Sequence, residues 1–257
     1  MKRILIGAGI VLVVLIVAVA AIVGSAFLGR QSIPDDAETN GIRIVKDGIV
    51  SVALVPIGPG QVALIDSGND STGQAVLAEL SRRQLGPEAV TAIFLTHGHG
   101  DHIGGVPRFP GAQVFALERE VALIEGREGA NGPVTRLMPV RPTGISVARP
   151  LRDGESVQVG NTSVRVFAMP GHTGGSAAYL VNGVLFLGDS ADLGSDGTLV
   201  GAPWVFSDSQ SENRQSLVRL SQRLAQEQAD VKAIACAHSG ISPDGLAALV
   251  AFARSNP

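Results

Sequence analysis

The protein has 257 residues, with 20 basic and 23 acidic side chains and a formal net charge of −3 at pH 7. Proteins that bind nucleic acids gain most of their affinity from a concentrated positive surface. The basic residues here form no cluster larger than a pair, so a nucleic-acid partner is not expected. Cys236 is the single cysteine; it excludes an internal disulfide and is interpreted as a small buried apolar residue.

Residues 4–28 contain no charged side chain and are mainly Val, Ile, Leu and Ala. A helix of this length crosses the roughly 30 Å hydrocarbon core of a bilayer. We therefore expect one transmembrane helix, within residues 1–30, with the lipid bilayer as its partner. Lys2 and Arg3 predict that the N-terminus stays in the cytoplasm and that the rest of the chain lies on the extracytoplasmic side. A cleaved signal peptide ending near residues 24–26 is the alternative, and would make the protein secreted or periplasmic.

The remainder of the chain predicts a mixed α/β fold. Residues 31–40 are polar and are expected to link the anchor to one domain, residues 41–257. Apolar runs predict strands at residues 42–45, 50–57, 62–65, 92–95, 114–116, 156–159, 164–168, 177–181, 184–187 and 231–237. Helical spacing predicts helices at residues 72–84, 117–126, 209–228 and 244–253. Strands interleaved with helices favour sheets covered by helices.

Two long loops are candidates for substrate selection. Residues 126–150 are irregular and rich in proline, which is typical of a binding loop or a mobile flap. Residues 191–207 carry the only tryptophan, Trp204. An aromatic side chain there either flanks a substrate or fills the loop as an apolar plug.

The stretch THGHGDHIGG, residues 96–105, holds three of the five histidines. His97 and His99 follow a predicted strand and are two positions apart, so their side chains point to one side and can bind a single ion. The surrounding glycines let the chain turn sharply. Asp101 and His102 can then face a second position, which predicts two neighbouring cations.

The other candidate ligands also follow predicted strands in short glycine-containing loops. His172 lies in PGHTGGS, Asp189 in LGDS and His238 in AHSG. A lone histidine is more often a core or surface residue, and His238 alone would indicate nothing. All five histidines at the ends of strands indicate a metal centre, as a hypothesis that the fold must support.

These motifs resemble the metallo-β-lactamase-fold hydrolase superfamily, in its glyoxalase II-like set. The resemblance covers residues 41–257 and implies a four-layer αβ/βα sandwich with a dinuclear site at one edge. By position it implies that the first ion is bound by His97, His99 and His172, the second by Asp101, His102 and His238, and that Asp189 bridges them.

Imidazole and carboxylate ligands without thiolate favour two Zn²⁺ ions, although iron or manganese is also accepted. A water shared by two such ions loses a proton near neutral pH. We expect this metal-bridging hydroxide to attack an ester, thioester, lactone or phosphodiester, a small-molecule substrate. Asp101 is the expected catalytic residue, orienting the hydroxide. Asp66 resembles the family position that orients a histidine ligand, or is simply a turn residue at the end of a strand.

The resemblance is also informative about subgroups of the superfamily. True β-lactamases of this fold lack the bridging aspartate that Asp189 supplies, which disfavours antibiotic hydrolysis. The stretch PGHTGGSAAYL is similar to hydroxyacylglutathione hydrolases. Two alternatives stay open: a mononuclear iron enzyme resembling persulfide dioxygenases, and a non-catalytic, membrane-anchored binding module. The complete set of seven ligands favours the metal-dependent hydrolase.

Overall fold

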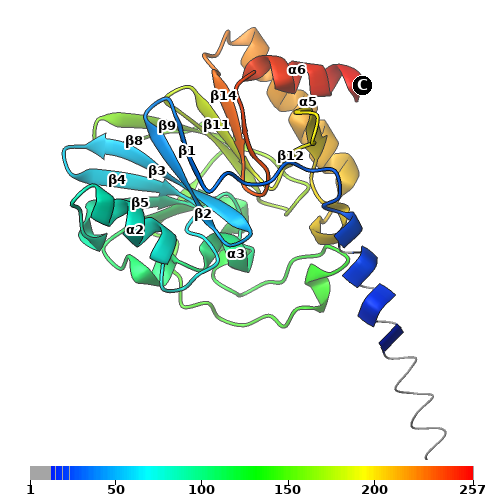
Figure 1. Cartoon of the computed structure of the whole chain (residues 1–257), viewed down its shortest axis with the longest axis horizontal. Coiled ribbons are helices and arrows are strands. Elements are labelled where there is room, and N and C mark those ends of the chain that lie inside the picture. The colour runs from blue at the N-terminus through cyan, green and yellow to red at the C-terminus, as the bar shows by residue number, and fades with distance from the viewer. Residues whose placement is uncertain (1–12, 15, 19, 23, 257) are drawn as a thin grey trace, which may run out of the picture.

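The computed structural model of the protein describes residues 13, 14, 16–18, 20–22 and 24–256, and Figure 1 shows their arrangement. Two β-sheets face each other. Apolar side chains from both sheets, including Val55, Phe94, Val166 and Tyr179, form one buried core between them. The burial of this shared core is what holds the two halves of the chain together.

The first sheet comes from the N-terminal half and has seven strands in the order β1-β2-β3-β4-β5-β6-β7. Neighbours from β1 to β4 pair antiparallel, and those from β4 to β7 pair parallel. The strands are β1 (Asp36–Thr39), β2 (Ile42–Asp47), β3 (Val50–Gly58), β4 (Gln61–Ile65), β5 (Val90–Phe94), β6 (Gln113–Leu117) and β7 (Arg149–Leu151).

The second sheet has six strands in the order β15-β14-β11-β10-β9-β8, and only β11 and β14 pair parallel. Its strands are β8 (Ser156–Val159), β9 (Thr162–Ala168), β10 (Ala177–Val181), β11 (Val184–Gly188), β14 (Ala233–Cys236) and β15 (Gly240–Ser242). A separate two-stranded sheet joins β12 (Ala191–Leu193) to β13 (Leu199–Gly201).

Helices cover the outer face of each sheet. Val76 and Leu80 of α2 (Gln74–Arg82) pack on the first sheet, as do α3 (Gly100–Ile103) and α4 (Val121–Ile124) through their apolar residues. Leu217 and Leu224 of α5 (Gln210–Gln226) pack on the second sheet beside α6 (Leu246–Ser255). The layers are therefore helix, sheet, sheet, helix, which fits the predicted αβ/βα sandwich.

Most predicted elements lie within a few residues of observed ones, with two informative differences. The polar segment 31–40 contains β1, which pairs with β2 along its whole length. An edge strand need not be apolar, because only one of its faces is covered. The predicted helix 117–126 is instead a 3₁₀ turn, Glu118–Glu120, followed by the single turn of α4.

The predicted N-terminal membrane helix is corrected by the structure. A span requires about 20 consecutive helical residues. In the part of the chain that the structure describes, no helix is long and apolar enough to cross a membrane. The described helical residues end at Ser25, and residues 26–29 turn toward the folded domain. The bilayer partner of residues 4–28 and the extracytoplasmic, secreted or periplasmic location are therefore unsupported. Much of that prediction, residues 4–12, 15, 19 and 23, lies outside the described residues.

Candidate metal centre

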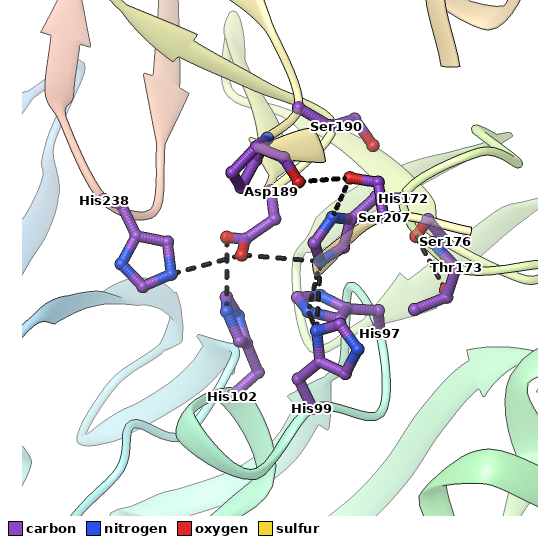
Figure 2. A network of polar contacts seen from close by, with 12 residues as sticks. His97, His99, His102, His172, Thr173, Ser176, Asp189, Ser190, Ser207 and His238 are labelled. Carbon is purple, nitrogen blue, oxygen red and sulfur yellow. Dashed lines mark hydrogen bonds and ion pairs between the residues drawn. The ribbon is translucent and has the colours of Figure 1, made fainter. Parts of the chain in front are cut away.

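The seven predicted ligands lie together at one edge of the two sheets. Figure 2 labels six of them, all except Asp101. His97 and His99 follow β5, and the loop continues directly into α3, which carries Asp101 and His102. His172 follows β9. Asp189 follows β11 and His238 follows β14; because these two strands run parallel, their carboxyl ends bring both side chains to the same place.

His97, His99 and His172, here called the first ligand group, aim three ring nitrogens at one point. His97 Nε2 lies 3.0 Å from His99 Nδ1 and 3.2 Å from His172 Nε2, and the third distance, from His172 Nε2 to His99 Nδ1, is 3.0 Å. A tetrahedral zinc ion with Zn–N bonds of about 2.0–2.1 Å separates its nitrogen ligands by about 3.3 Å. The spacing of the three nitrogens therefore fits one such ion.

Burial keeps the first ligand group neutral. Loss of solvent lowers the pKa of His172 to about 3 and lowers the pKa values of His97 and His99 as well. The neighbouring imidazoles add to the effect at His97, since like charges this close disfavour protonation. A neutral imidazole offers the lone pair that a metal ion requires.

Asp101, His102 and His238, the second ligand group, lie beside the first. His238 Nε2 is 3.3 Å from Asp101 Oδ2, and His102 Nε2 is 3.8 Å from the same oxygen. Burial opposes the imidazolium of His238, but Asp189 and Asp101 outweigh it and raise its pKa to about 10. The carboxylates likewise overcome burial to raise the pKa of His102 well above its usual value.

Asp189 contacts both groups. Its Oδ2 lies 3.5 Å from His172 Nε2 and 3.2 Å from His238 Nε2, and its Oδ1 lies 3.2 Å from His102 Nε2. Burial disfavours the carboxylate, but His238 and His102 outweigh it and hold the pKa of Asp189 well below its usual value. An ionised carboxylate thus stands between the two groups.

Buried polar atoms in the centre lack ordinary partners. His102 Nε2 and Asp189 Oδ1 are enclosed and face each other over 3.2 Å, but neither atom forms a hydrogen bond of good geometry among the described residues. Leaving such atoms unsatisfied is costly in an interior of low dielectric. Coordination of a cation would satisfy both atoms, so the residues present fit a metal centre.

The ring orientation of four histidines is set by hydrogen bonds from their outward nitrogens. His102 Nδ1 is 2.8 Å from Asp66 Oδ2, so the carboxylate accepts its proton and leaves Nε2 facing the centre. His238 Nδ1 donates to the carbonyl of Ile49 over 2.6 Å. His172 Nδ1 lies 3.1 Å from Ser207 Oγ, and His97 Nδ1 lies 3.1 Å from Thr96 Oγ1. Asp66 therefore lies where the sequence analysis expected a supporting carboxylate.

Glu120 is a site residue that the sequence analysis missed. Its carboxylate is buried, and its Oε1 accepts hydrogen bonds from Gly98 N and Thr173 Oγ1, each over 2.8 Å. Burial raises its pKa to about 7. It joins the loop of His97 and His99 to the loop of His172. No local pattern in the sequence indicates this role for Glu120, because a glutamate within a predicted helix is usually exposed to solvent.

A cavity of about 750 Å³ opens beside the centre, within the range of roughly 300–1,000 Å³ that small-molecule sites occupy. His99, Asp101, Asp189 and His238 reach its surface. The predicted loop 126–150 contributes Thr135 and Met138, and the loop 191–207 contributes Phe206. Trp204 is largely exposed and does not line the cavity.

Comparison with protein families matches residues 45–238, well over half of the chain, to the description "Metallo-beta-lactamase superfamily". The chain belongs to this superfamily. The predicted resemblance is therefore confirmed.

Among individual relatives, the hydroxyacylglutathione hydrolase of Citrobacter koseri is 30% identical over 183 residues, which cover 70% of this chain and 57% of that protein. The enzyme of the same name from Gloeothece citriformis is 34% identical over 128 residues, 46% of this chain and 42% of that protein. This superfamily member thus spans about half the length of the curated relatives it matches. Their names support the predicted metal-dependent hydrolase.

Solved structures confirm the fold. A B3 metallo-beta-lactamase with an active-site glutamic acid aligns with a TM-score of 0.65 and 20% identity, covering 90% of this chain and 91% of that one. A metallo-beta-lactamase from Novosphingobium pentaromativorans aligns with a TM-score of 0.64 and 23% identity, covering 89% of each chain. At these identities the likeness concerns the fold alone.

Proposed function

We propose that this superfamily member is a metal-dependent hydrolase that uses two zinc ions to cleave an ester, thioester or lactone. The observation that carries the proposal is the position of Asp189, which contacts both ligand groups through its two oxygens. In this proposal the first ligand group binds one ion, the second ligand group binds the other, and Asp189 bridges them. The catalytic domain is residues 41–257.

Zinc is proposed because the donors are imidazoles and carboxylates. When bound, two such ions polarise the scissile carbonyl and lower the pKa of an attacking water. The protein groups hold and orient the reactants. Four outward hydrogen bonds fix the imidazole rings of the ligands, so little motion is needed during the reaction.

Asp101 is the proposed catalytic residue. It belongs to the second ligand group and also lines the cavity where a substrate would bind. Burial would raise its pKa, but His102 and His238 outweigh burial and lower it to about 2. Its carboxylate therefore stays ionised at neutral pH. One oxygen can accept a hydrogen bond from the attacking water and align it with the substrate.

The relatives named hydroxyacylglutathione hydrolases favour a thioester or a related acyl substrate. A phosphodiester is also compatible with a dinuclear centre, whose ions would bind its charged oxygens. Positive side chains beside the centre would favour it further. Among the described residues that line the cavity, Lys46 is the one lysine or arginine, and its Nζ is 3.1 Å from Asp35 Oδ1. An acyl substrate is thus the better match.

Metal analysis of the full chain, purified without added metal, tests the proposal together with a substrate panel. Mass spectrometry should find close to two zinc ions per chain, and at least one ester, thioester or lactone should be hydrolysed, with a phosphodiester and a β-lactam as comparisons. One iron per chain with oxygen uptake would instead indicate the dioxygenase. Neither metal nor turnover would indicate the binding module.

Single substitutions separate the roles of the two ligand groups. His97→Ala should remove the first ion and lower kcat/KM by about 10³-fold or more, since a direct ligand is lost. Asp101→Ala should lower kcat with a smaller change in KM, since the Asp101 carboxylate acts on the attacking water. If both variants keep full metal content and full activity, the site assignment is wrong.

A further inference from the structure

One wall of the cavity is built by a segment that precedes the region matched to the superfamily. Residues 27–33, here called the strap, cross the edge of the second sheet beside β12 (Figure 1). Phe27 and Ile33 of the strap line the cavity together with the ligands of the centre. The family match begins only at residue 45.

The strap is held in place by polar contacts with β12 and the loop that follows it. Arg30 forms an ion pair with the buried carboxylate of Asp192. Gln31 N donates to Leu193 O over 2.9 Å, and Ser195 N donates to Gly29 O over 2.6 Å. Breaking the Arg30–Asp192 ion pair would leave an uncompensated buried charge. The pair therefore holds the strap against the domain.

Phe27 extends from the strap over the metal centre. Its ring centroid lies 6.0 Å from that of Phe206 and 6.3 Å from the imidazole of His238. The Arg30 guanidinium lies over the same ring, 5.1 Å from its centroid, and this cation–π contact stabilises the position of Phe27. An aromatic side chain so placed, yet still 36% exposed, presents apolar surface to whatever enters the cavity.

Further apolar side chains continue this wall around the cavity. Ile49 is 66% exposed and Met138 is 58% exposed, although both are large and apolar. Exposed apolar surface concentrated at a concave site is typical of a ligand-binding surface. We call Phe27, Ile33, Ile49, Met138 and Phe206 the apolar wall.

We propose that the apolar wall binds the uncharged apolar acyl group of the substrate, and that Phe27 of the strap determines specificity for acyl length. This inference rests on the proposed hydrolase function and names the substrate class of the same site. Acyl chains fit because the wall adjoins His238 and Asp189, where the scissile carbonyl would lie. Burial of an acyl chain against the wall releases water from both surfaces.

A series of p-nitrophenyl esters from acetate to hexanoate tests this inference on the zinc-loaded full chain. Each fully buried CH₂ is worth at most about fourfold in kcat/KM. We expect hexanoate to exceed acetate on the order of tenfold or more, because part of the chain stays in contact with water. Phe27→Ala should lower this hexanoate-to-acetate ratio by about fivefold or more.

Matched variants guard against a general structural effect. Leu28→Ala removes a neighbouring apolar side chain that is 79% exposed and does not line the cavity; its ratio should equal that of the unmodified protein. Phe27→Leu keeps apolar surface at the position and should retain most of the preference. Equal losses on both esters in Phe27→Ala, or the same change in Leu28→Ala, would overturn the role of Phe27.

Binding of the free carboxylates gives a second readout that does not depend on turnover. Calorimetry should show hexanoate binding about tenfold tighter than acetate to the zinc-loaded chain, with most of the difference lost in Phe27→Ala. Equal affinities, or ester turnover that does not vary with acyl length, would overturn the inference while leaving the hydrolase intact. Tighter hexanoate binding without turnover of any substrate would support the apolar wall and contradict the hydrolase.

Discussion

The first and second ligand groups lie side by side around Asp189 but differ in the protonation of their imidazoles. His97 and His172 are buried, His99 is largely so, and all three stay neutral, because loss of solvent and nearby imidazoles both disfavour their protonation. His102 and His238 are also buried, yet their pKa values are raised.

The difference arises from where the carboxylates lie. Asp66, Asp101 and Asp189 surround His102, and the last two also contact His238. Among the described residues, the first ligand group has one ion-pair contact with a carboxylate, from His172 Nε2 to Asp189 Oδ2 over 3.5 Å. Asp101 and Asp208 act on His99 from beyond ion-pair distance. Burial alone therefore does not decide the charge of a histidine; the nearest carboxylate does. Only the second ligand group has to exchange protons for a metal ion.

The largest effect is expected from breaking the link between the groups. Asp189→Ala should reduce metal content below two ions per chain and lower kcat/KM by about 10³-fold or more, since both ions lose a ligand. Asp196→Ala, at an exposed position away from the centre, is the matched control. Two retained ions with undiminished turnover would show that Asp189 does not bridge the groups.

The next largest effect should come from competition between protons and metal ions, which should differ between the two ligand groups. His238, with a pKa of about 10, carries a proton at neutral pH, and a bound metal ion must displace it. Affinity for the second ion should therefore rise with pH between pH 6 and 8, by at least about tenfold per unit, because the pKa of His102 is raised as well. The first ion should show little change, since His172 loses its proton near pH 3. Chelator competition at several pH values measures both slopes, and equal slopes would contradict the comparison.

Removal of the carboxylate that orients His102 should weaken the second ligand group most. Asp66→Ala takes away the acceptor of His102 Nδ1. Loss of such an outer partner typically costs about 10–100-fold in metal affinity. Titration with zinc should show a weaker second ion and a smaller loss at the first ion, because Asp66 also accepts from Thr96, whose hydroxyl contacts His97 Nδ1. A loss confined to the first ion would reverse the assignment of His102.

Glu120 should affect the first ligand group alone, and more weakly. Glu120→Ala removes the acceptor shared by Gly98 N and Thr173 Oγ1, so the two loops that carry the first ligand group separate. We expect about tenfold weaker binding of the first ion, at the low end of such effects. Glu120→Gln keeps an acceptor oxygen and should recover most of the affinity. If Glu120→Ala lowers only thermal stability, Glu120 has no positioning role.

Much of the fold and of the candidate site could be predicted because the relevant signals are local. Apolar runs mark most strands of both sheets. A histidine or aspartate directly after such a run lies at the end of a strand, so His97, His172 and His238 were found without any knowledge of pairing. Cys236 is buried as expected. The N-terminal membrane prediction was wrong, since no helix among the described residues is long and apolar enough to cross a membrane.

The sequence by itself determined which side chains are available as ligands and that they follow strands, since both depend on residue type and short-range pattern. Only the tertiary structure decided how they divide into a neutral and a charged group, because carboxylates from separate loops set the pKa values. Glu120 joins loops 22 and 53 residues away, and Phe27 reaches His238 from the opposite end of the chain. Such contacts are made by folding and leave no local pattern in the sequence.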